Sequence, residues 1–171
     1  MRNVIAFVAL LVGICGCTDR GGQPRLEPLE RGLAGVWQPA TRDLKLEIQA
    51  EMNGERVTLH CVLRNISATA IKVDSSTLPW ITPGFFSIDA VTASGRVVHR
   101  NALVSRISNF PSPVSIASGE SMDGAIDLGV MPITDLPRDE DLLLLWSYGL
   151  ADGGSDAHFL LSGITLLKRK S

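Results

Sequence analysis

The stretch LKLEIQAEMNGERVTLHCVL, from Leu44 to Leu63, carries the clearest structural pattern in this 171-residue chain. Apolar and polar residues alternate from Leu44 to Met52, which is typical of a strand with one buried face. Asn53-Gly54 follows, and this dipeptide is favoured in two-residue hairpin turns because both central residues need φ > 0. The alternation resumes from Val57 to Leu63. The stretch therefore predicts a β-hairpin.

A two-residue loop at Asn53-Gly54 also predicts the register of the hairpin. The expected apolar pairs are Ala50–Val57, Ile48–Leu59, Leu46–Cys61 and Leu44–Leu63. The expected polar pairs are Glu51–Arg56, Gln49–Thr58 and Glu47–His60. A slip of one residue would turn every apolar side chain toward water, so one face of the hairpin is strongly specified. Cys61 lies on that face, and we expect its thiol to be buried.

The rest of the chain after residue 43 predicts further short strands at spacings of about 8–12 residues, which is the pattern of a β-sandwich. Residues 85–93 and 96–100 are expected to pair around Ser94-Gly95, and residues 114–116 and 122–128 around Ser118-Gly119. Residues 142–148 are apolar on both faces, as expected for a central strand of a two-layer fold. The other predicted strands cover 70–73 and 158–167. We predict an all-β antiparallel sandwich of seven or eight strands.

Three features resemble the small immunoglobulin-like domains of bacterial envelope proteins. They are an apolar strand that ends in Arg64-Asn65, a Ser118-Gly119-Glu120-Ser121 corner that leads into a strand, and a late leucine-rich strand with Trp146. The resemblance covers residues 43–168 and implies an immunoglobulin-like β-sandwich. The Cys…Trp…Cys pattern of antibody domains is absent. Because this architecture hosts many roles, the resemblance implies a fold and no particular function.

The first residues of the chain have the layout of an export signal. Arg2 supplies a positive charge, and Val4 to Ile14 is an apolar run interrupted only by Gly13. As a helix this run would be about 16 Å long, whereas a bilayer core of about 30 Å needs about 20 residues. The run therefore has the length of a signal-peptide hydrophobic region. We assign residues 1–16 to a signal peptide.

The string Ile14-Cys15-Gly16-Cys17 resembles the lipobox of bacterial lipoproteins, with an aliphatic residue at −3, small residues at −2 and −1, and the obligatory cysteine. Cys15 at −2 departs from the usual pattern. The resemblance implies cleavage before Cys17 and lipidation, including palmitate, of Cys17. It also implies the outer membrane, facing the periplasm, because Thr18 rather than aspartate follows the cysteine. The alternative is an ordinary secretory signal with a chance cysteine.

Composition restricts the function classes of the mature chain, which has roughly 155 residues and so suits one domain. The net charge of the whole chain is −2, and no basic patch of the size that nucleic-acid binding requires is present. Residues 17–42 are rich in Gly, Pro, Arg and Glu, and predict a lipidated cysteine followed by a flexible tether. Within that tether, helix-like spacing favours a short helix that docks on the domain, carried by Leu26, Leu29, Leu33, Val36 and Trp37.

Patterns that would indicate catalysis are largely missing. Gly119-Glu120-Ser121-Met122-Asp123 lacks the final glycine of a serine-hydrolase elbow and lies between predicted strands. His60, His99 and His158 fall on separate segments without zinc-binding spacing. Glu47 opposite His60 could form a dyad, although a polar pair on a wet strand face is the ordinary finding. We therefore predict no enzyme, no metal and no cofactor.

One segment, residues 78–86, has the composition of a recognition loop. Binding residues gather on loops and Trp is enriched at interaction hot spots, so a partner surface could be formed by Pro79, Trp80, Ile81, Phe85 and Phe86. The alternative, which we favour for Trp80 and Phe86, is that these two rings plug the open end of the sandwich.

These observations favour a membrane-anchored periplasmic lipoprotein that binds another protein, for example as an inhibitor or immunity protein. The first alternative is a structural accessory of an envelope or secretion assembly. The second is a hydrolase that uses Ser121 and His60. The expected partners are the membrane, through lipid on Cys17, and a protein.

Overall fold

The computed structural model of the chain describes residues 26, 30, 43–53, 56–83, 86–94, 96–99, 112–128, 140–154 and 158–168. The predicted signal peptide, Cys17, most of the predicted tether and Phe85 lie outside the described residues. The described segments form nine strands and one short 3-10 helix. They are β1 (Leu44–Asn53), β2 (Arg56–Asn65), β3 (Ile71–Asp74), η1 (Ser75–Thr77), β4 (Phe86–Thr92), β5 (Val97–His99), β6 (Pro113–Ile116), β7 (Ser121–Asp127), β8 (Leu142–Ala151) and β9 (His158–Leu167).

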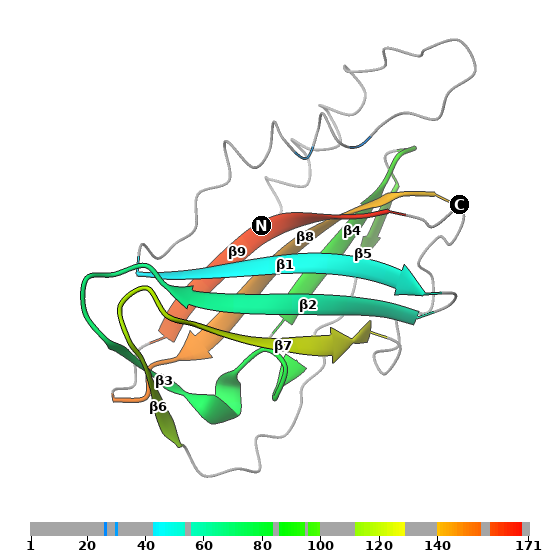
Figure 1. Cartoon of the computed structure of the whole chain (residues 1–171). Coiled ribbons are helices and arrows are strands. Elements are labelled where there is room, and N and C mark those ends of the chain that lie inside the picture. The colour runs from blue at the N-terminus through cyan, green and yellow to red at the C-terminus, as the bar shows by residue number, and fades with distance from the viewer. Residues whose placement is uncertain are drawn as a thin grey trace.

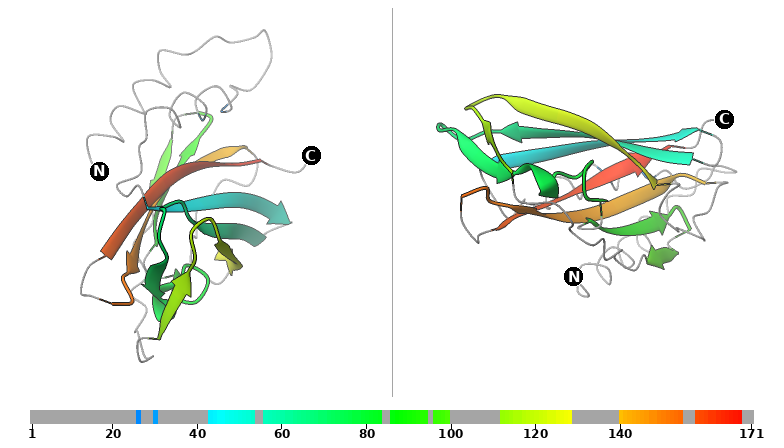
Figure 2. Two further views of the ribbon diagram at one scale, coloured as in Figure 1. Left: turned by 60° about the vertical axis from the view of Figure 1, so that its left-hand side comes forward. Right: turned by 90° about the horizontal axis from the view of Figure 1, so that it is seen from below.

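The strands form two packed layers with a small extra ribbon (Figures 1 and 2). One layer is a three-stranded antiparallel sheet in the order β1-β2-β7, and the other is a four-stranded sheet in the order β5-β4-β8-β9. The ribbon pairs β3 with β6 at one end of the sandwich. The fold is an all-β sandwich, as the sequence predicts, and each predicted strand overlaps an observed one.

The register of the first hairpin differs from the prediction by two residues. Ala50 lies opposite Leu59 rather than Val57, and Leu46 lies opposite Leu63 rather than Cys61. A shift of two leaves every side chain on its predicted face, so the alternation of the sequence does not distinguish the two registers. The observed register separates Asn53 from its partner Arg56 by two residues. It also adds a pair of buried side chains, Met52 opposite Val57.

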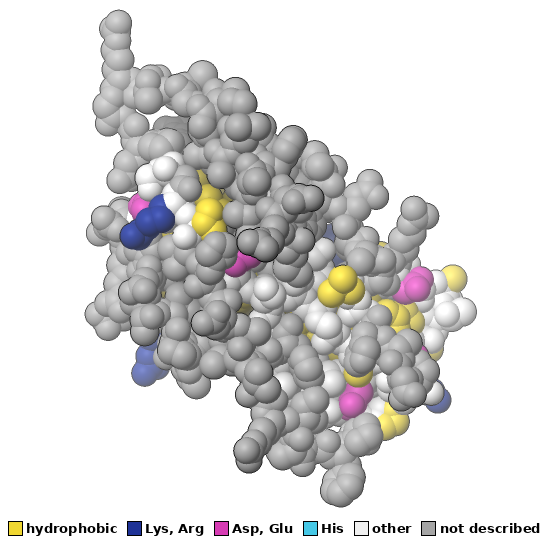
Figure 3. All heavy atoms as spheres, turned by 180° about the vertical axis from the view of Figure 1, so that it is seen from behind, with side chains coloured by type: hydrophobic (Ala, Val, Ile, Leu, Met, Phe, Trp, Pro, Cys, Tyr) yellow, Lys and Arg dark blue, Asp and Glu magenta, His cyan; other side chains and the backbone are white. Residues whose placement is uncertain are grey.

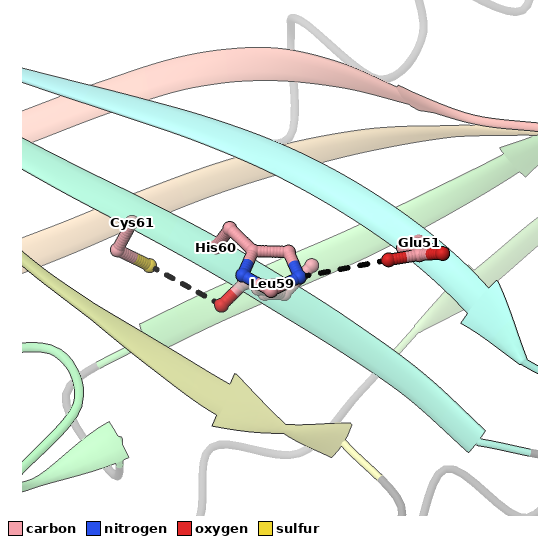
Figure 4. A network of polar contacts seen from close by, with 4 residues as sticks. All are labelled: Glu51, Leu59, His60 and Cys61. Atoms are coloured by element: carbon pink, nitrogen blue, oxygen red, sulfur yellow. Dashed lines mark hydrogen bonds and ion pairs between the residues drawn. The ribbon is translucent and has the colours of Figure 1, made fainter.

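The predicted pairing of Glu47 with His60 is wrong for the same reason. His60 lies opposite Gln49, and its Nε2 is 3.7 Å from a carboxylate oxygen of Glu51 (Figure 4). Glu47 instead pairs with Lys45 at 2.6 Å on the exposed face of β1. The hydrogen bond from Lys45 and its positive charge lower the pKa of Glu47. The Lys45–Glu47 contact is an exposed ion pair of the kind that contributes little to stability, and the His60–Glu51 contact likewise joins two exposed side chains.

The predicted hairpin of residues 114–116 with 122–128 is also wrong. β6 pairs with β3, and β7 pairs with β2. The Ser118-Gly119 turn is present, with Gly119 at a φ of 77°, a conformation that favours glycine. A turn sequence specifies where the chain bends, but it does not specify which strands pair. Here β6 and β7 each pair with a strand from the first half of the chain.

Asn65 is the residue that joins these segments. It is fully buried, its Nδ2 donates to the carbonyls of Thr69 at 2.7 Å and Ile116 at 2.9 Å, and its Oδ1 accepts from the amide and hydroxyl of Ser67. Its backbone amide donates to Glu120 O, and its carbonyl accepts from the Gly119 amide. Two features that the sequence presents separately, the Arg64-Asn65 strand end and the Ser118–Ser121 corner, therefore form one joint.

The main core lies between the two sheets, and β8 runs through the middle of the four-stranded sheet with buried residues on both faces, as predicted. Trp146 is 5% exposed and Cys61 is 1% exposed, which confirms their predicted core positions. Burial raises the pKa of Cys61 to about 12, and its thiol lies 3.8 Å from Leu59 O (Figure 4). Because the thiolate is the reactive form, this cysteine is chemically inert in the folded domain.

Candidate interaction site in the loop after β3

The loop from Asp74, the last residue of β3, to Pro83 lies between the two sheets, on the side away from β1 and β9 (Figures 1 and 2). We call it the 74–83 loop. It contains η1 and three of the five residues predicted to form a partner surface, Pro79, Trp80 and Ile81. A fourth, Phe86, is the first residue of β4, and Phe85 lies outside the described residues.

Asp74 caps the start of the loop. Its Oδ1 accepts hydrogen bonds from the amide of Ser76 at 2.9 Å, the hydroxyl of Ser76 at 2.8 Å and the amide of Ser112 at 3.2 Å. Burial alone would raise the pKa of Asp74, but the donors from Ser76 and Ser112 outweigh it and lower the pKa below its ordinary value. The carboxylate therefore holds the first turn of the loop and ties it to the residue before β6.

Replacing Asp74 by alanine is expected to destabilise the domain by about 1–2 kcal/mol at neutral pH, because it removes a capping acceptor from three donors. A lowered pKa means that the charged form stabilises the fold at pH values above the ordinary pKa of 3.8. This contribution is lost as the pH falls through the lower folded-state pKa. The difference between wild type and D74A, measured by urea unfolding at pH 7 and pH 2.5, should therefore shrink at the lower pH. An equal difference at both pH values would contradict this account, and D123A on the exposed face of β7 is the control.

The middle of the loop is held by hydrogen bonds from Tyr148 and Ala151 of β8. The hydroxyl of Tyr148 donates to Thr77 O and lies 3.4 Å from Thr82 O, and the Thr77 hydroxyl accepts from the amide of Ala151 at 3.1 Å. The Thr82 hydroxyl donates to Ser76 O at 2.6 Å. Burial raises the pKa of Tyr148, so its hydroxyl keeps the proton that it donates. The loop is thus fixed at both ends and in its middle.

Trp80 and Phe86 fill the interior beneath this loop rather than its surface. Phe86 is 1% exposed, and its ring centroid lies 4.5 Å from that of Tyr148. Trp80 is half-buried and packs against the main core, and its ring lies over Gly124 of β7, where an added Cβ would be 2.7 Å from Cδ1. This placement agrees with the alternative that these rings plug the open side of the sandwich.

Ile81 is the residue of this loop that projects into solvent, with 53% of its surface exposed, while Leu78 and Pro79 are buried. Ile81 N donates to Leu78 O at 2.9 Å, so the exposed side chain sits on a hydrogen-bonded turn. In the space-filling view from behind, the visible apolar side chains of described residues lie in small separate groups (Figure 3). The apolar surface that this loop offers to a partner is therefore the side chain of Ile81, held on a hydrogen-bonded turn.

The two residues considered for a hydrolase are not brought together. His60 lies opposite Ala125, whereas Ser121 lies opposite Arg64, four residues further along β2. At the rise of a strand this separates them by about 13 Å, beyond hydrogen-bond reach. The residues around Ser121 form a turn that enters β7 and not a strand-to-helix elbow. Within the described ranges, no three His, Cys, Asp or Glu side chains gather as metal ligands would.

Sequence reasoning missed two residues that position this loop, Tyr148 and Gly124. Tyr148 lies in a run of apolar residues that reads as uniform core, and its bond partners are backbone carbonyls of a distant loop. Gly124 is a glycine inside a strand, a signal for close approach by another group. That signal could have suggested a large side chain packed over β7, without identifying it as Trp80.

No described segment forms a helix with the length and hydrophobicity that a bilayer crossing requires. No protein-family model matches the chain. No curated protein sequence matches it either.

Solved structures of similar shape exist, at low sequence identity. A structural-genomics target designated SoR45 is 11% identical, with 75% of this chain and 88% of that chain covered and a TM-score of 0.46. A Bordetella pertussis protein provisionally named ApaA is 13% identical, with 74% and 94% covered and a TM-score of 0.40. The Pseudomonas fluorescens alkylpurine DNA glycosylase AlkC, bound to DNA, is 17% identical, with 74% and 30% covered and a TM-score of 0.30. Similarities of this size assign neither a fold family nor a function to the chain.

Proposed function

We propose that this chain is a lipid-anchored, non-enzymatic binding module of the bacterial cell envelope, and that its sandwich is immunoglobulin-like. Support for the fold is the strand order. In immunoglobulin-like domains strands A, B and E share one sheet and C, F and G the other. Here β1-β2-β7 and β4-β8-β9 take the corresponding places in chain order.

The anchor rests on the lipobox-like string Ile14-Cys15-Gly16-Cys17. One acyl chain binds membranes only marginally, whereas the three chains of a lipoprotein would hold the domain at the membrane surface. The outer membrane, facing the periplasm, is the expected location because Thr18 follows Cys17. A domain anchored in this way can bind only partners that come as close to the membrane as the chain between Cys17 and the domain allows.

The observation that carries the binding function is the exposed Ile81 on the 74–83 loop. Loops that are ordered before binding lose less conformational entropy when a partner arrives, so a rigid loop is a good binding element. Asp74, Thr77 and Tyr148 provide that order through the hydrogen bonds described above. Trp80, the neighbour of Ile81 in the chain, packs against the main core and supports the loop from beneath. An inhibitor or immunity protein that blocks a periplasmic protein is the concrete form of this function.

The test is capture of a partner from envelope extract by the immobilised domain, followed by loss of capture in I81D. Ile66 is 50% exposed in the turn after β2, so I66D is the matched control that adds the same charge elsewhere. We expect I81D to lose the partner and I66D to retain it, with both variants unfolding at the temperature of wild type. Equal retention by I81D, or no partner for wild type, would contradict the proposal. Stoichiometric co-purification with a membrane complex would instead indicate a structural accessory.

A further inference from the structure

A second apolar cluster lies on the outer face of the four-stranded sheet, away from the main core. Its buried members on the sheet are Val91 and Leu143, both 0% exposed, and Leu145, 5% exposed, and Ala93 in the turn after β4 is also 5% exposed. The half-buried residues packed against them are Val97, Ile164 and Leu166. The outer face of an antiparallel sandwich is ordinarily polar and solvated. An apolar outer face that is buried must be covered by another part of the chain.

Leu26, from the region between Cys17 and β1, belongs to this cluster and is 4% exposed. Four residues later, the amide of Glu30 donates a hydrogen bond to Leu26 O at 2.8 Å. Burying a leucine side chain contributes about 1.5–3 kcal/mol. Leu26 therefore anchors this part of the chain to the sheet.

Glu30 makes a second, independent contact with the sheet. Its Oε1 accepts a hydrogen bond from the amide of Leu166 on β9 at 3.3 Å. β9 is an edge strand in the order β5-β4-β8-β9, and amides on the outer side of an edge strand have no neighbouring strand to bond. A carboxylate that accepts a hydrogen bond from such an amide satisfies this donor, and it also prevents another strand from pairing with the edge at this position.

We propose that Leu26 and Glu30 form a clasp that fastens the chain to the outer face of the four-stranded sheet. The lipid part of this inference rests on the proposed anchor at Cys17. If the clasp holds, the spacer from Cys17 is only residues 18–25, and the domain is attached to the membrane through the outer face of this sheet instead of through the start of β1. The r.m.s. reach of a flexible chain falls from about 28 Å for 25 residues to about 15 Å for eight.

The clasp is tested by limited digestion of the full chain, extracted from membranes in detergent, with trypsin. Arg25 and Arg31 flank the clasp, while Arg20 lies in the spacer and serves as the internal reference. In wild type, cleavage after Arg25 and Arg31 should be at least about tenfold slower than after Arg20, since proteases need locally open chain. L26D should raise both rates to that of Arg20. L160D, at a 51% exposed leucine on the same strand β9, should leave them unchanged.

A second variant, E30A, tests the hydrogen bond between Glu30 and the amide of Leu166, and its result does not depend on Leu26. In E30A the amide of Leu166 should exchange its hydrogen at least about tenfold faster than in wild type, with the rest of β9 unchanged. Cleavage after Arg31 as fast as after Arg20 in wild type, or an unchanged Leu166 amide in E30A, would overturn the clasp. Both readouts are independent of lipidation and of partner capture, so they separate failure of the clasp from failure of the proposed function.

Discussion

Replacement of Asn65 by alanine should destabilise the domain by about 3–4 kcal/mol. The side chain is fully buried and makes four hydrogen bonds, two as donor and two as acceptor. A typical hydrogen bond contributes about 1 kcal/mol net, and buried partners left unsatisfied add a penalty of about 1–3 kcal/mol. The loss should be large because the hydrogen bond from Asn65 to the carbonyl of Ile116 is buried, where such a bond contributes most.

The measurement is urea unfolding of N65A beside wild type, with the slope m used to check that both transitions remain two-state. Q49A, on the exposed face of β1, is the control and should change stability by less than about 0.5 kcal/mol. N65D separates the two halves of the network, because it keeps an acceptor for Ser67 but donates to neither carbonyl. A loss below about 1 kcal/mol in N65A would mean that the joint does not hold β2, β6 and β7 together.

Replacement of Gly163 by alanine should destabilise the domain by about 3 kcal/mol, at the upper end of the range for overpacking a core. A Cβ at this position would overlap the ring of Trp146, with Cε2 only 2.8 Å away. The ring cannot move aside easily. Its Nε1 donates to Thr165 Oγ1 at 3.1 Å, and that hydroxyl in turn donates to Ile48 O at 3.1 Å on the opposite sheet.

A double-mutant cycle assigns this cost to the overlap itself. In the W146L background the indole is gone, so G163A should cost less than about 1 kcal/mol. Gly149 on β8 provides the matched control, because a Cβ added there meets nothing within 4 Å, and G149A should be neutral or slightly stabilising. Equal costs of G163A in the two backgrounds, measured by thermal or urea unfolding, would refute the assignment.

The strands of this fold could be predicted from the sequence because the pattern of apolar and polar residues that specifies each strand lies within the strand itself. The alternation from Leu44 to Leu63 fixes which side chains face the core, and the leucine-rich run at 142–148 identifies a strand buried on both faces. The register of the first hairpin could not be predicted, since a shift of two residues preserves both faces. In the structure Asn53 pairs with Arg56, so the two positions between the paired strands are Gly54-Glu55 instead of Asn53-Gly54, and Leu44 pairs with Asn65.

The contacts that build the candidate site depend on residues distant in sequence, and local patterns do not contain them. Composition indicates residues 78–86 as a recognition segment, but the exposure of Ile81 and the burial of Phe86 follow from where Tyr148 and Gly124 lie. Likewise, the pairing of β6 with β3 and of β7 with β2 is decided by tertiary packing and by Asn65. Helix-like spacing did point to Leu26 as a docking residue, and its burial confirms that part of the expectation.

The most direct test of the central claim is mass spectrometry of the N-terminal peptide of the membrane-extracted protein. Trypsin should release the peptide Cys17-Thr18-Asp19-Arg20, and the account predicts that it begins at Cys17 and carries three acyl chains. C17S should instead accumulate with residues 1–16 still attached. An unmodified Cys17, or a mature N-terminus at another residue, would contradict the lipid anchor.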